Sequence, residues 1–142
     1  MIHPRHRTEL RVRYAESDQM GYAHHSVFIV WFEQGRVDWL RERGFSYREL
    51  EAEGIMMPVA SLQLRYLQPA RFDDALVVTT ELVKLGRCRI EFHNQILRCE
   101  ADGSETLLAE GQVVLASVGR HGRPIRLPDP LHAALAQHRV EA

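Results

Sequence analysis

The sequence predicts an α+β fold in which one long, buried helix packs against an antiparallel sheet. Residues 27–43 contain the most apolar stretch of the 142-residue chain. A helix with so few polar side chains near its start must be covered on most sides. From residue 55 onward, apolar and polar residues alternate with the period of two that is typical of half-buried strands. The turns between these strands are short, which favours antiparallel neighbours.

A strand, a loop and the long helix are predicted in that order near the N-terminus. Residues 8–14 (TELRVRY) alternate in polarity and indicate a half-buried strand. The loop 15–25 follows it. Ser26 is a suitable N-cap for a helix over about 27–43, and Gly44 can end that helix in the left-handed conformation.

The remaining elements form a short helix, four strands and a C-terminal helix. Ser46 and Glu49 have the spacing of a capping box at the start of the short helix. The tetrapeptide ADGS at 101–104 is typical of a turn between strands. Another short helix is expected at about 131–139. The four strands are expected at about 59–67, 75–85, 87–97 and 106–118.

Composition and charge indicate one ordinary globular domain over residues 1–142, with a core at about 8–118 and a tail at 119–142. The net charge of −1 gives no reason to expect binding to nucleic acid or to an anionic membrane. The N-terminus lacks the apolar core of a signal peptide, and no apolar run reaches the roughly 18 residues of a membrane span. Cys88 and Cys99 do not make a disulfide framework, and a cytoplasmic location is expected.

Self-association is also expected from the pattern of apolar residues. One helix cannot cover every apolar position on both faces of so long a sheet. Apolar edge strands also need protection from pairing with other chains. Both features favour a dimer that extends the sheet or packs sheet against sheet.

Three stretches, which together span most of residues 8–118, carry a family resemblance. The first, VRYAESDQMGYAHHSVFIVWFEQGRVDWL, holds an acid (Asp18), a glycine three residues later (Gly21), a histidine seven residues later (His25) and the helix pattern Phe-Glu-x-x-Arg-x-x-x-Leu. The others are YLQPARFDDALVVTTEL and LLAEGQVVLASV. The chain resembles the hotdog fold and, more narrowly, the 4-hydroxybenzoyl-CoA thioesterase family, in the bacterial subgroup often encoded with the Tol–Pal envelope system.

This resemblance implies a long central helix wrapped by a five-stranded antiparallel sheet. It also implies hydrolysis of acyl-CoA thioesters to free acid and CoA. Coenzyme A is then part of the substrate, and no separate cofactor is expected. The resemblance further implies a homodimer or a homotetramer.

By the same resemblance, Asp18 is the catalytic acid residue. Its carboxylate can attack the thioester carbonyl to form a mixed anhydride, or it can deprotonate water; the sequence leaves both routes open. The alternative is an aspartate that only stabilises a turn. Backbone N–H groups at the start of the long helix are unpaired donors with partial positive charge, and they are expected to polarise the thioester carbonyl.

His25 and Tyr14 match two further positions of the family site. His25 either donates a hydrogen bond to the thioester or to Asp18, or it merely caps or packs at the start of the helix. Tyr14 belongs either to the pocket or to the core face of the first strand.

Substrate contacts are expected from His24, Gly21, Phe28 and the segment Met57-Pro58-Val59. The subgroup commonly has tyrosine where this chain has Phe28 and often where it has His24. These departures leave the preference for acyl-chain length or ring open. In the family, the region that contains Met57, Pro58 and Val59 faces the active site of the neighbouring subunit.

No metal site is expected. His24 and His25 are adjacent in an extended loop, so their side chains point in different directions, and no further ligand stands at a recognisable spacing from Asp18. His3 and His6 are expected to belong to a disordered end.

Charged side chains suggest two further expectations. Glu33 and Arg36 are three apart on the long helix and can form a buried pair. Arginines are also expected to meet the phosphates of CoA, although none is singled out. The candidates are Arg87, Arg89, Arg120, Arg123 and Arg126.

Two other functions are compatible with the same fold. One is a non-catalytic module that binds acyl-CoA, because fold alone does not determine function. The other is a hotdog dehydratase or hydratase. The stretch HHSVFIVWFE lacks the Pro-Gly-rich approach of those enzymes, which disfavours this second alternative.

Overall fold

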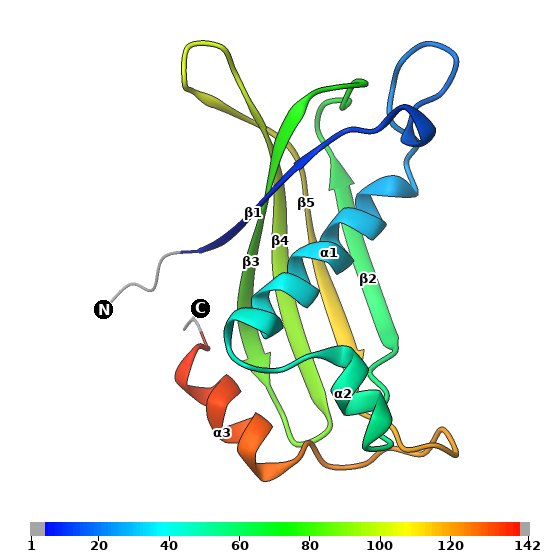
Figure 1. The fold of residues 1–142 in the computed structure, drawn as a ribbon, viewed down its shortest axis with the longest axis vertical. Coiled ribbons are helices and arrows are strands. Elements are labelled where there is room, and N and C mark those ends of the chain that lie inside the picture. The colour runs from blue at the N-terminus through cyan, green and yellow to red at the C-terminus, as the bar shows by residue number, and fades with distance from the viewer. Residues whose placement is uncertain (1–4, 140–142) are drawn as a thin grey trace.

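The computed structural model of the chain describes residues 5–139, in which one five-stranded sheet packs against the helix α1 (Figure 1). The helices are α1 (Val27–Glu42), α2 (Tyr47–Ala52) and α3 (Asp129–Gln137), with a short 3-10 helix at Tyr14–Glu16. The strands are β1 (His6–Arg11), β2 (Val59–Tyr66), β3 (Ala75–Leu85), β4 (Arg89–Cys99) and β5 (Glu105–Ala116). The predicted α+β class and the five antiparallel strands are confirmed.

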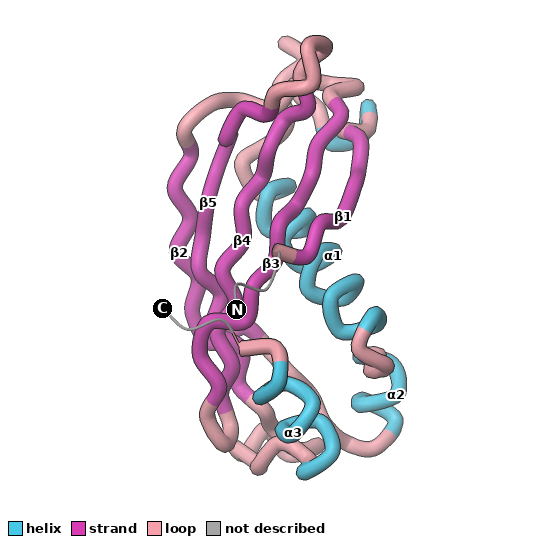
Figure 2. The backbone as a smooth tube through the Cα atoms, turned by 90° about the vertical axis from the view of Figure 1, so that its left-hand side faces the viewer, coloured by secondary structure: helices cyan, strands magenta, loops and turns pink. Residues whose placement is uncertain are grey.

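The strands lie in the order β1-β3-β4-β5-β2, and every neighbouring pair is antiparallel. Figure 2 shows this order across the sheet, with α1 and α2 on one side of it. In the centre of the sheet, Phe92 of β4 stands opposite Leu82 of β3 and Val113 of β5. β2 pairs only with β5 within the described chain, so its other side is an open edge.

The core lies between α1 and the sheet. Trp31, Phe32 and Trp39 of α1 are almost completely buried, and the Trp39 ring contacts Phe92 edge-on with centroids 5.2 Å apart. Two glycines allow a close approach. A Cβ at Gly35 of α1 would meet β3 side-chain atoms at 2.7 and 2.8 Å. One at Gly111 of β5 would meet the Phe32 ring at 2.7 Å. The position of α1 against the sheet therefore depends on two glycines, which lack a Cβ, as well as on large aromatic side chains.

The C-terminal end of α1 forms as the sequence predicts, but the N-terminal end lacks the predicted side-chain cap. Gly44 has a φ of 86°, and the N–H groups of Gly44 and Phe45 donate to the carbonyls of Arg41 and Leu40. These are the two bonds of a Schellman motif, so the predicted end is confirmed. Ser26 directly precedes the helix as predicted, but its side chain makes no cap hydrogen bond. Its backbone is itself helical, with φ −67° and ψ −20°, whereas a capping residue is normally extended.

The first strand is shorter than predicted. β1 ends at Arg11, and Tyr14 lies in the 3-10 helix with 79% of its surface exposed. The prediction that Tyr14 ends the strand is therefore wrong, because the chain turns before reaching it. The second helix agrees with its prediction, since Ser46 Oγ accepts the N–H of Glu49 at 3.1 Å.

His6 does not lie in a disordered end but in β1, with its ring between two carboxylates of α1. Its Nε2 is 2.9 Å from Asp38 Oδ2, and its Nδ1 is 2.9 Å from Glu42 Oε2. Hydrogen bonds from His6 and Thr8 hold the pKa of Asp38 below its ordinary value. These contacts fasten β1 to the last turns of α1. His3, named in the same prediction, lies outside the described residues.

The predicted pair of Glu33 and Arg36 does not form. Glu33 faces solvent, whereas Arg36 is 4% exposed, and none of the ion pairs within residues 5–139 joins them. The two positions lie on opposite sides of the boundary between the solvent-facing and covered surfaces of α1.

None of the helices within residues 5–139 is both long and apolar enough to cross a membrane. The cytoplasmic location stays a prediction.

Candidate active site

A cavity of about 390 Å³ lies where the loop before α1 meets the end of β2. Asp18, His24, His25 and Phe28 line it from the loop and the first turn of α1. Tyr66 is among the residues that line it from the end of β2 and the following loop. The sequence predicted that the first four residues serve one site, and the fold brings all four to this cavity.

Asp18 holds the loop together and also lines the cavity. Its Oδ1 accepts the backbone N–H groups of Met20 and Tyr22 at 2.8 and 3.0 Å. Its own N–H donates to the carbonyl of Tyr22 at 2.7 Å, and its carbonyl accepts the N–H of Gly21. The turn role that the sequence offered as an alternative is therefore real. Since both side-chain bonds described here end on Oδ1, the second oxygen, Oδ2, is available to a substrate.

Gly21 contributes the backbone conformation of this turn. Its φ is 82°, a left-handed value that glycine adopts without steric cost. Gly21 does not line the cavity itself. Its predicted substrate contact stays a prediction, and its role in the structure is to let the loop return toward α1.

The loop closes as a short hairpin that leads into α1. Ser17 forms an antiparallel bridge with Ala23, and the His24 N–H donates to the Glu16 carbonyl at 3.0 Å. The next turn begins α1, where the Val27 N–H donates to the His24 carbonyl at 3.1 Å. Backbone hydrogen bonds thus hold the segment of His24 and His25 just before the first turn of α1. Both side chains are exposed and line the cavity.

The N-terminal end of α1 faces the same cavity. The first N–H groups of a helix lack acceptors within the helix and lie at the positive end of its dipole. Phe28, the second residue of α1, lines the cavity, and the uncommitted Ser26 side chain does not occupy the donors of this turn. The start of α1 therefore borders the cavity without a side-chain cap from Ser26.

Tyr66 is a cavity residue that sequence reasoning treated only as part of a strand face. Its hydroxyl donates to the His25 carbonyl at 2.7 Å. Its ring contacts those of His25 and Phe28 edge-on, with centroids 5.1 Å apart in both cases. Burial raises the pKa of Tyr66, so the phenol keeps its proton at neutral pH. The motif YLQPA, which begins at this tyrosine, was the available signal.

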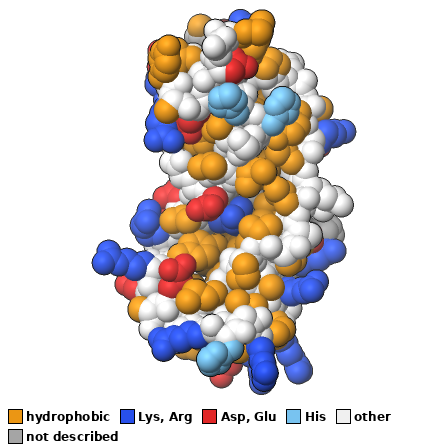
Figure 3. Space-filling view, turned by 90° about the vertical axis from the view of Figure 1, so that its right-hand side faces the viewer, with side chains coloured by type: hydrophobic (Ala, Val, Ile, Leu, Met, Phe, Trp, Pro, Cys, Tyr) orange, Lys and Arg blue, Asp and Glu red, His pale blue; other side chains and the backbone are white. Residues whose placement is uncertain are grey.

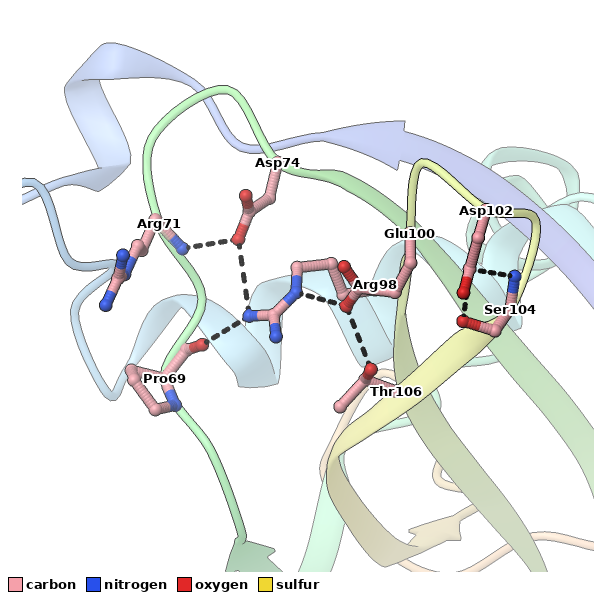
Figure 4. A network of polar contacts seen from close by, with 8 residues as sticks. All are labelled: Pro69, Arg71, Asp74, Arg98, Glu100, Asp102, Ser104 and Thr106. Atoms are coloured by element: carbon pink, nitrogen blue, oxygen red, sulfur yellow. Dashed lines mark hydrogen bonds and ion pairs between the residues drawn. The ribbon is translucent and has the colours of Figure 1, made fainter.

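Arg98 of β4 holds the loop between β2 and β3 that forms the far wall (Figure 4). Its Nε donates to Glu100 Oε1 at 2.7 Å, and its Nη1 donates to the Pro69 carbonyl at 3.4 Å. Asp74 lies 3.8 Å from the same Nη1 and accepts the backbone N–H of Arg71. Because Pro69 lines the cavity, this network fixes that wall.

A family model described as the thioesterase-like superfamily matches residues 12–135. The match includes the whole cavity and every strand of the sheet except β1. The chain belongs to the thioesterase-like superfamily.

Individual members of this superfamily are similar to the chain over different lengths. The acyl-CoA thioester hydrolase YbgC of Escherichia coli is 30% identical over 132 residues, which cover 92% of this chain and 96% of YbgC. The Bacillus subtilis protein YneP is 39% identical over 72 residues, which cover 51% of this chain and 52% of YneP. The crystal structure of the DHNA-CoA thioesterase from Staphylococcus aureus aligns with a TM-score of 0.86 at 31% identity, covering 94% of this chain and 89% of that one. These findings confirm the hotdog fold and place the protein among thioesterase enzymes.

Other predicted site residues of this thioesterase-like chain do not line the cavity. Tyr14 does not line it and packs edge-on against Phe72, with ring centroids 5.4 Å apart. Met57, Pro58 and Val59 stand at the opposite end of β2 from Tyr66. At about 3.3 Å per residue, that end is roughly 20 Å away. Within one chain, none of these four residues lines the cavity that Asp18 lines, and their predicted roles in the site stay predictions.

Within residues 5–139, no group of three or more His, Cys, Asp or Glu side chains is arranged to hold a metal ion. The expectation of a reaction without a metal stays a prediction.

Proposed function

We propose that this protein hydrolyses acyl-CoA thioesters to free acid and CoA, with Asp18 as the reacting carboxylate. The observation that carries the proposal is the meeting of Asp18 and the N-terminal end of α1 at one cavity. The names of YbgC and of the Staphylococcus aureus enzyme support thioester substrates. The finer assignment to the Tol–Pal-associated subgroup, drawn from sequence resemblance, is part of this proposal.

Asp18 acts by one of two routes that use the same oxygen. In the first, Oδ2 attacks the thioester carbonyl, CoA leaves as a thiolate, and water hydrolyses the resulting mixed anhydride. In the second, the carboxylate takes a proton from water, and the resulting hydroxide attacks the carbonyl. The hydrogen bonds to Oδ1 support either route because they hold the carboxylate in place without occupying Oδ2.

Backbone N–H groups at the start of α1 stabilise the negative charge that develops on the carbonyl oxygen. Donors aimed at such an oxygen are worth about 3 kcal/mol each in comparable sites. The uncapped Ser26 supports this role, because a capping side chain would compete for the same donors. His25 then orients the thioester, and Phe28 and His24 contact the acyl group.

The complete site requires a second copy of the chain. We propose a homodimer in which two β2 edges pair in antiparallel fashion, with α1 as the central helix of the hotdog architecture. Such pairing places the start of one β2 beside the end of the other. Met57, Pro58 and Val59 of one copy then reach the cavity of its partner. A homotetramer built from such dimers satisfies the same requirement.

The experiment measures the release of free thiol from a panel of acyl-CoAs. We expect wild-type protein to release CoA from at least one member, and Asp18→Asn to lower turnover by about 10³-fold or more while folding and binding are kept. Asp102→Asn is the matched control. Asp102 also accepts a backbone N–H in a turn, that of Ser104 at 2.8 Å, but it lies in the β4–β5 hairpin away from the cavity.

Two outcomes would change the assignment. Wild-type rates in Asp18→Asn would remove the proposed mechanism. Tight binding of acyl-CoA without thiol release would favour the non-catalytic binding module, and hydration or dehydration of an acyl-CoA without thiol release would favour the hydratase alternative. If His25→Ala is more damaging than Asp18→Asn, the two roles are reversed.

A further inference from the structure

Glu16 is a buried carboxylate just before the reacting loop. Only 7% of its surface is exposed, although it lies two residues before the exposed Asp18. Burying a carboxylate is costly unless hydrogen bonds compensate it. Glu16 does not line the cavity, and the proposed reaction does not use it.

The contacts of Glu16 join three parts of the site. Its Oε2 accepts the indole N–H of Trp31, in the second turn of α1, at 3.1 Å. Its Oε1 accepts the backbone N–H of Arg13, three residues earlier at the start of the 3-10 helix, at 2.8 Å. Its carbonyl accepts the N–H of His24 at 3.0 Å. One residue therefore ties the strand leading into the loop, the histidine segment and the helix together.

Protonation of the Glu16 carboxylate would remove an acceptor from its side-chain bonds with Arg13 and Trp31. Burial by itself would raise the pKa of Glu16, but the hydrogen bonds from Arg13 and Trp31 outweigh it and hold the pKa below the ordinary value. The group is consequently ionised at neutral pH, where both of its oxygens accept hydrogen bonds.

We infer that Glu16 is a positioning residue that sets the location of Asp18 relative to the N-terminal end of α1. This inference rests on the proposed function and adds a residue to it. The bond to Trp31 fixes the loop to the helix whose N–H groups receive the carbonyl oxygen. The bond to His24 fixes the opposite side of the hairpin. A displacement of about 1 Å between reacting groups is enough to lower a rate by about 10²-fold.

The main variant is Glu16→Gln, which keeps the size of the side chain. An amide has one acceptor oxygen and one NH₂ donor, so it cannot accept from both Arg13 and Trp31. One of the two N–H groups then faces another donor. Trp31→Phe is the second variant, because it removes the indole N–H and leaves an aromatic ring in the core. Glu9→Gln, at an exposed position in β1, is the matched control.

A positioning role and a purely structural role predict different kinetics. For Glu16→Gln, we expect a fall in kcat of about 10- to 100-fold per folded molecule, with KM within about threefold of wild type. Trp31→Phe is expected to lower kcat in the same direction, and Glu9→Gln to leave it unchanged. If Glu16→Gln lowers only the melting temperature and keeps the wild-type kcat, Glu16 stabilises the fold and the inference is overturned.

Hydrogen exchange separates failure of this inference from failure of the proposed function. The amides of Asp18 and Tyr22 are protected by bonds within the loop, so faster exchange at 17–25 in Glu16→Gln reports a loosened loop independently of turnover. If wild-type protein releases no thiol, the proposed function fails and exchange alone decides. Faster exchange than in Glu9→Gln then supports the anchor, and equal exchange overturns it. If Glu16→Gln is too unstable to assay, kcat and hydrogen exchange at 17–25 are measured on Trp31→Phe instead, and the same outcomes support or overturn the inference.

Discussion

At the scale of single residues, Asp18 shows how a turn residue also serves chemistry. Aspartate suits this turn because a short carboxylate can accept N–H groups two and four residues ahead. Both bonds use the same oxygen, so the turn fixes the carboxylate and leaves the other oxygen to the cavity. An asparagine can keep the turn but lacks the negative charge, which is why Asp18→Asn is the informative change.

Two tyrosines are candidates for a role in the site. Tyr66 lines the cavity, whereas Tyr14 was assigned to the site by sequence resemblance. Tyr66→Phe removes the hydroxyl that bonds to the His25 carbonyl but keeps the ring contacts with His25 and Phe28. A hydrogen bond of this kind contributes about 1 kcal/mol. We therefore expect kcat/KM for acyl-CoA hydrolysis to fall by about 5- to 10-fold with little change in folding.

Tyr14→Phe is the comparison variant, since Tyr14 is the tyrosine that sequence resemblance assigns to the site. Because Tyr14 is exposed and does not line the cavity in this chain, we expect Tyr14→Phe to lower kcat/KM less than Tyr66→Phe does. A larger loss of kcat/KM for Tyr14→Phe would show that the resemblance outweighs the geometry of a single chain.

At the scale of the elements, α1 and the sheet fit together most tightly at Gly35. Alanine normally improves on glycine in a helix by about 1 kcal/mol. Here its methyl group would lie 2.7 Å from Thr80 Oγ1 and 2.8 Å from Val78 Cγ1, which belong to stiff, β-branched side chains on a buried strand. Overpacking costs about 1–3 kcal/mol, and contacts this short with stiff side chains favour the upper part of that range, about 2–3 kcal/mol, which exceeds the gain.

Gly35→Ala is accordingly expected to lower the free energy of unfolding by about 1–2 kcal/mol, against the usual helix preference. Urea denaturation of the variant measures this change. Gln34→Ala, at the adjacent exposed position of α1, is the control and should differ little from wild type. An unchanged or increased stability in Gly35→Ala would mean that α1 can move away from β3 without cost.

Periodicity identified the elements because it depends on neighbours in the sequence. The alternation in VASLQLRY and the apolar run after Ser26 were enough to predict β2 and α1. The order β1-β3-β4-β5-β2 could not be predicted in the same way. A period of two shows which face of a strand is buried, but not which strand becomes its neighbour.

The site was predictable where its residues are close in the sequence. Asp18, His24 and His25 share one loop, and a loop of that length keeps them together. The roles of Glu16 and Tyr66 could not be predicted from the sequence because they depend on distant residues. Glu16 bonds to Trp31, 15 positions away, and Tyr66 bonds to His25, 41 positions away. Those contacts exist only after α1 has packed against β2 and the loop.

At the scale of the whole molecule, one side of the protein exposes large apolar side chains to water. Figure 3 shows hydrophobic side chains gathered over the side that carries β2 and the start of α1, with histidine side chains near one end. Ile29 and Val30 of α1 are 37% and 52% exposed, and Val59 of β2 is 48% exposed. Exposed apolar side chains gathered on one side of a molecule are typical of an interaction site.

The proposed β2-to-β2 dimer covers this side and completes the site, so assembly and activity should fail together. We expect light scattering coupled to size exclusion to give the mass of a dimer or a tetramer for the wild type, and of a monomer for Val30→Lys, because a lysine buried at an interface without a partner is costly. Lys84 is exposed on β3, which β4 and β5 separate from β2 in the sheet, so Lys84→Ala is a control that should keep the wild-type mass. A fully active Val30→Lys monomer would contradict the shared site, since one chain alone leaves Met57, Pro58 and Val59 roughly 20 Å from the cavity.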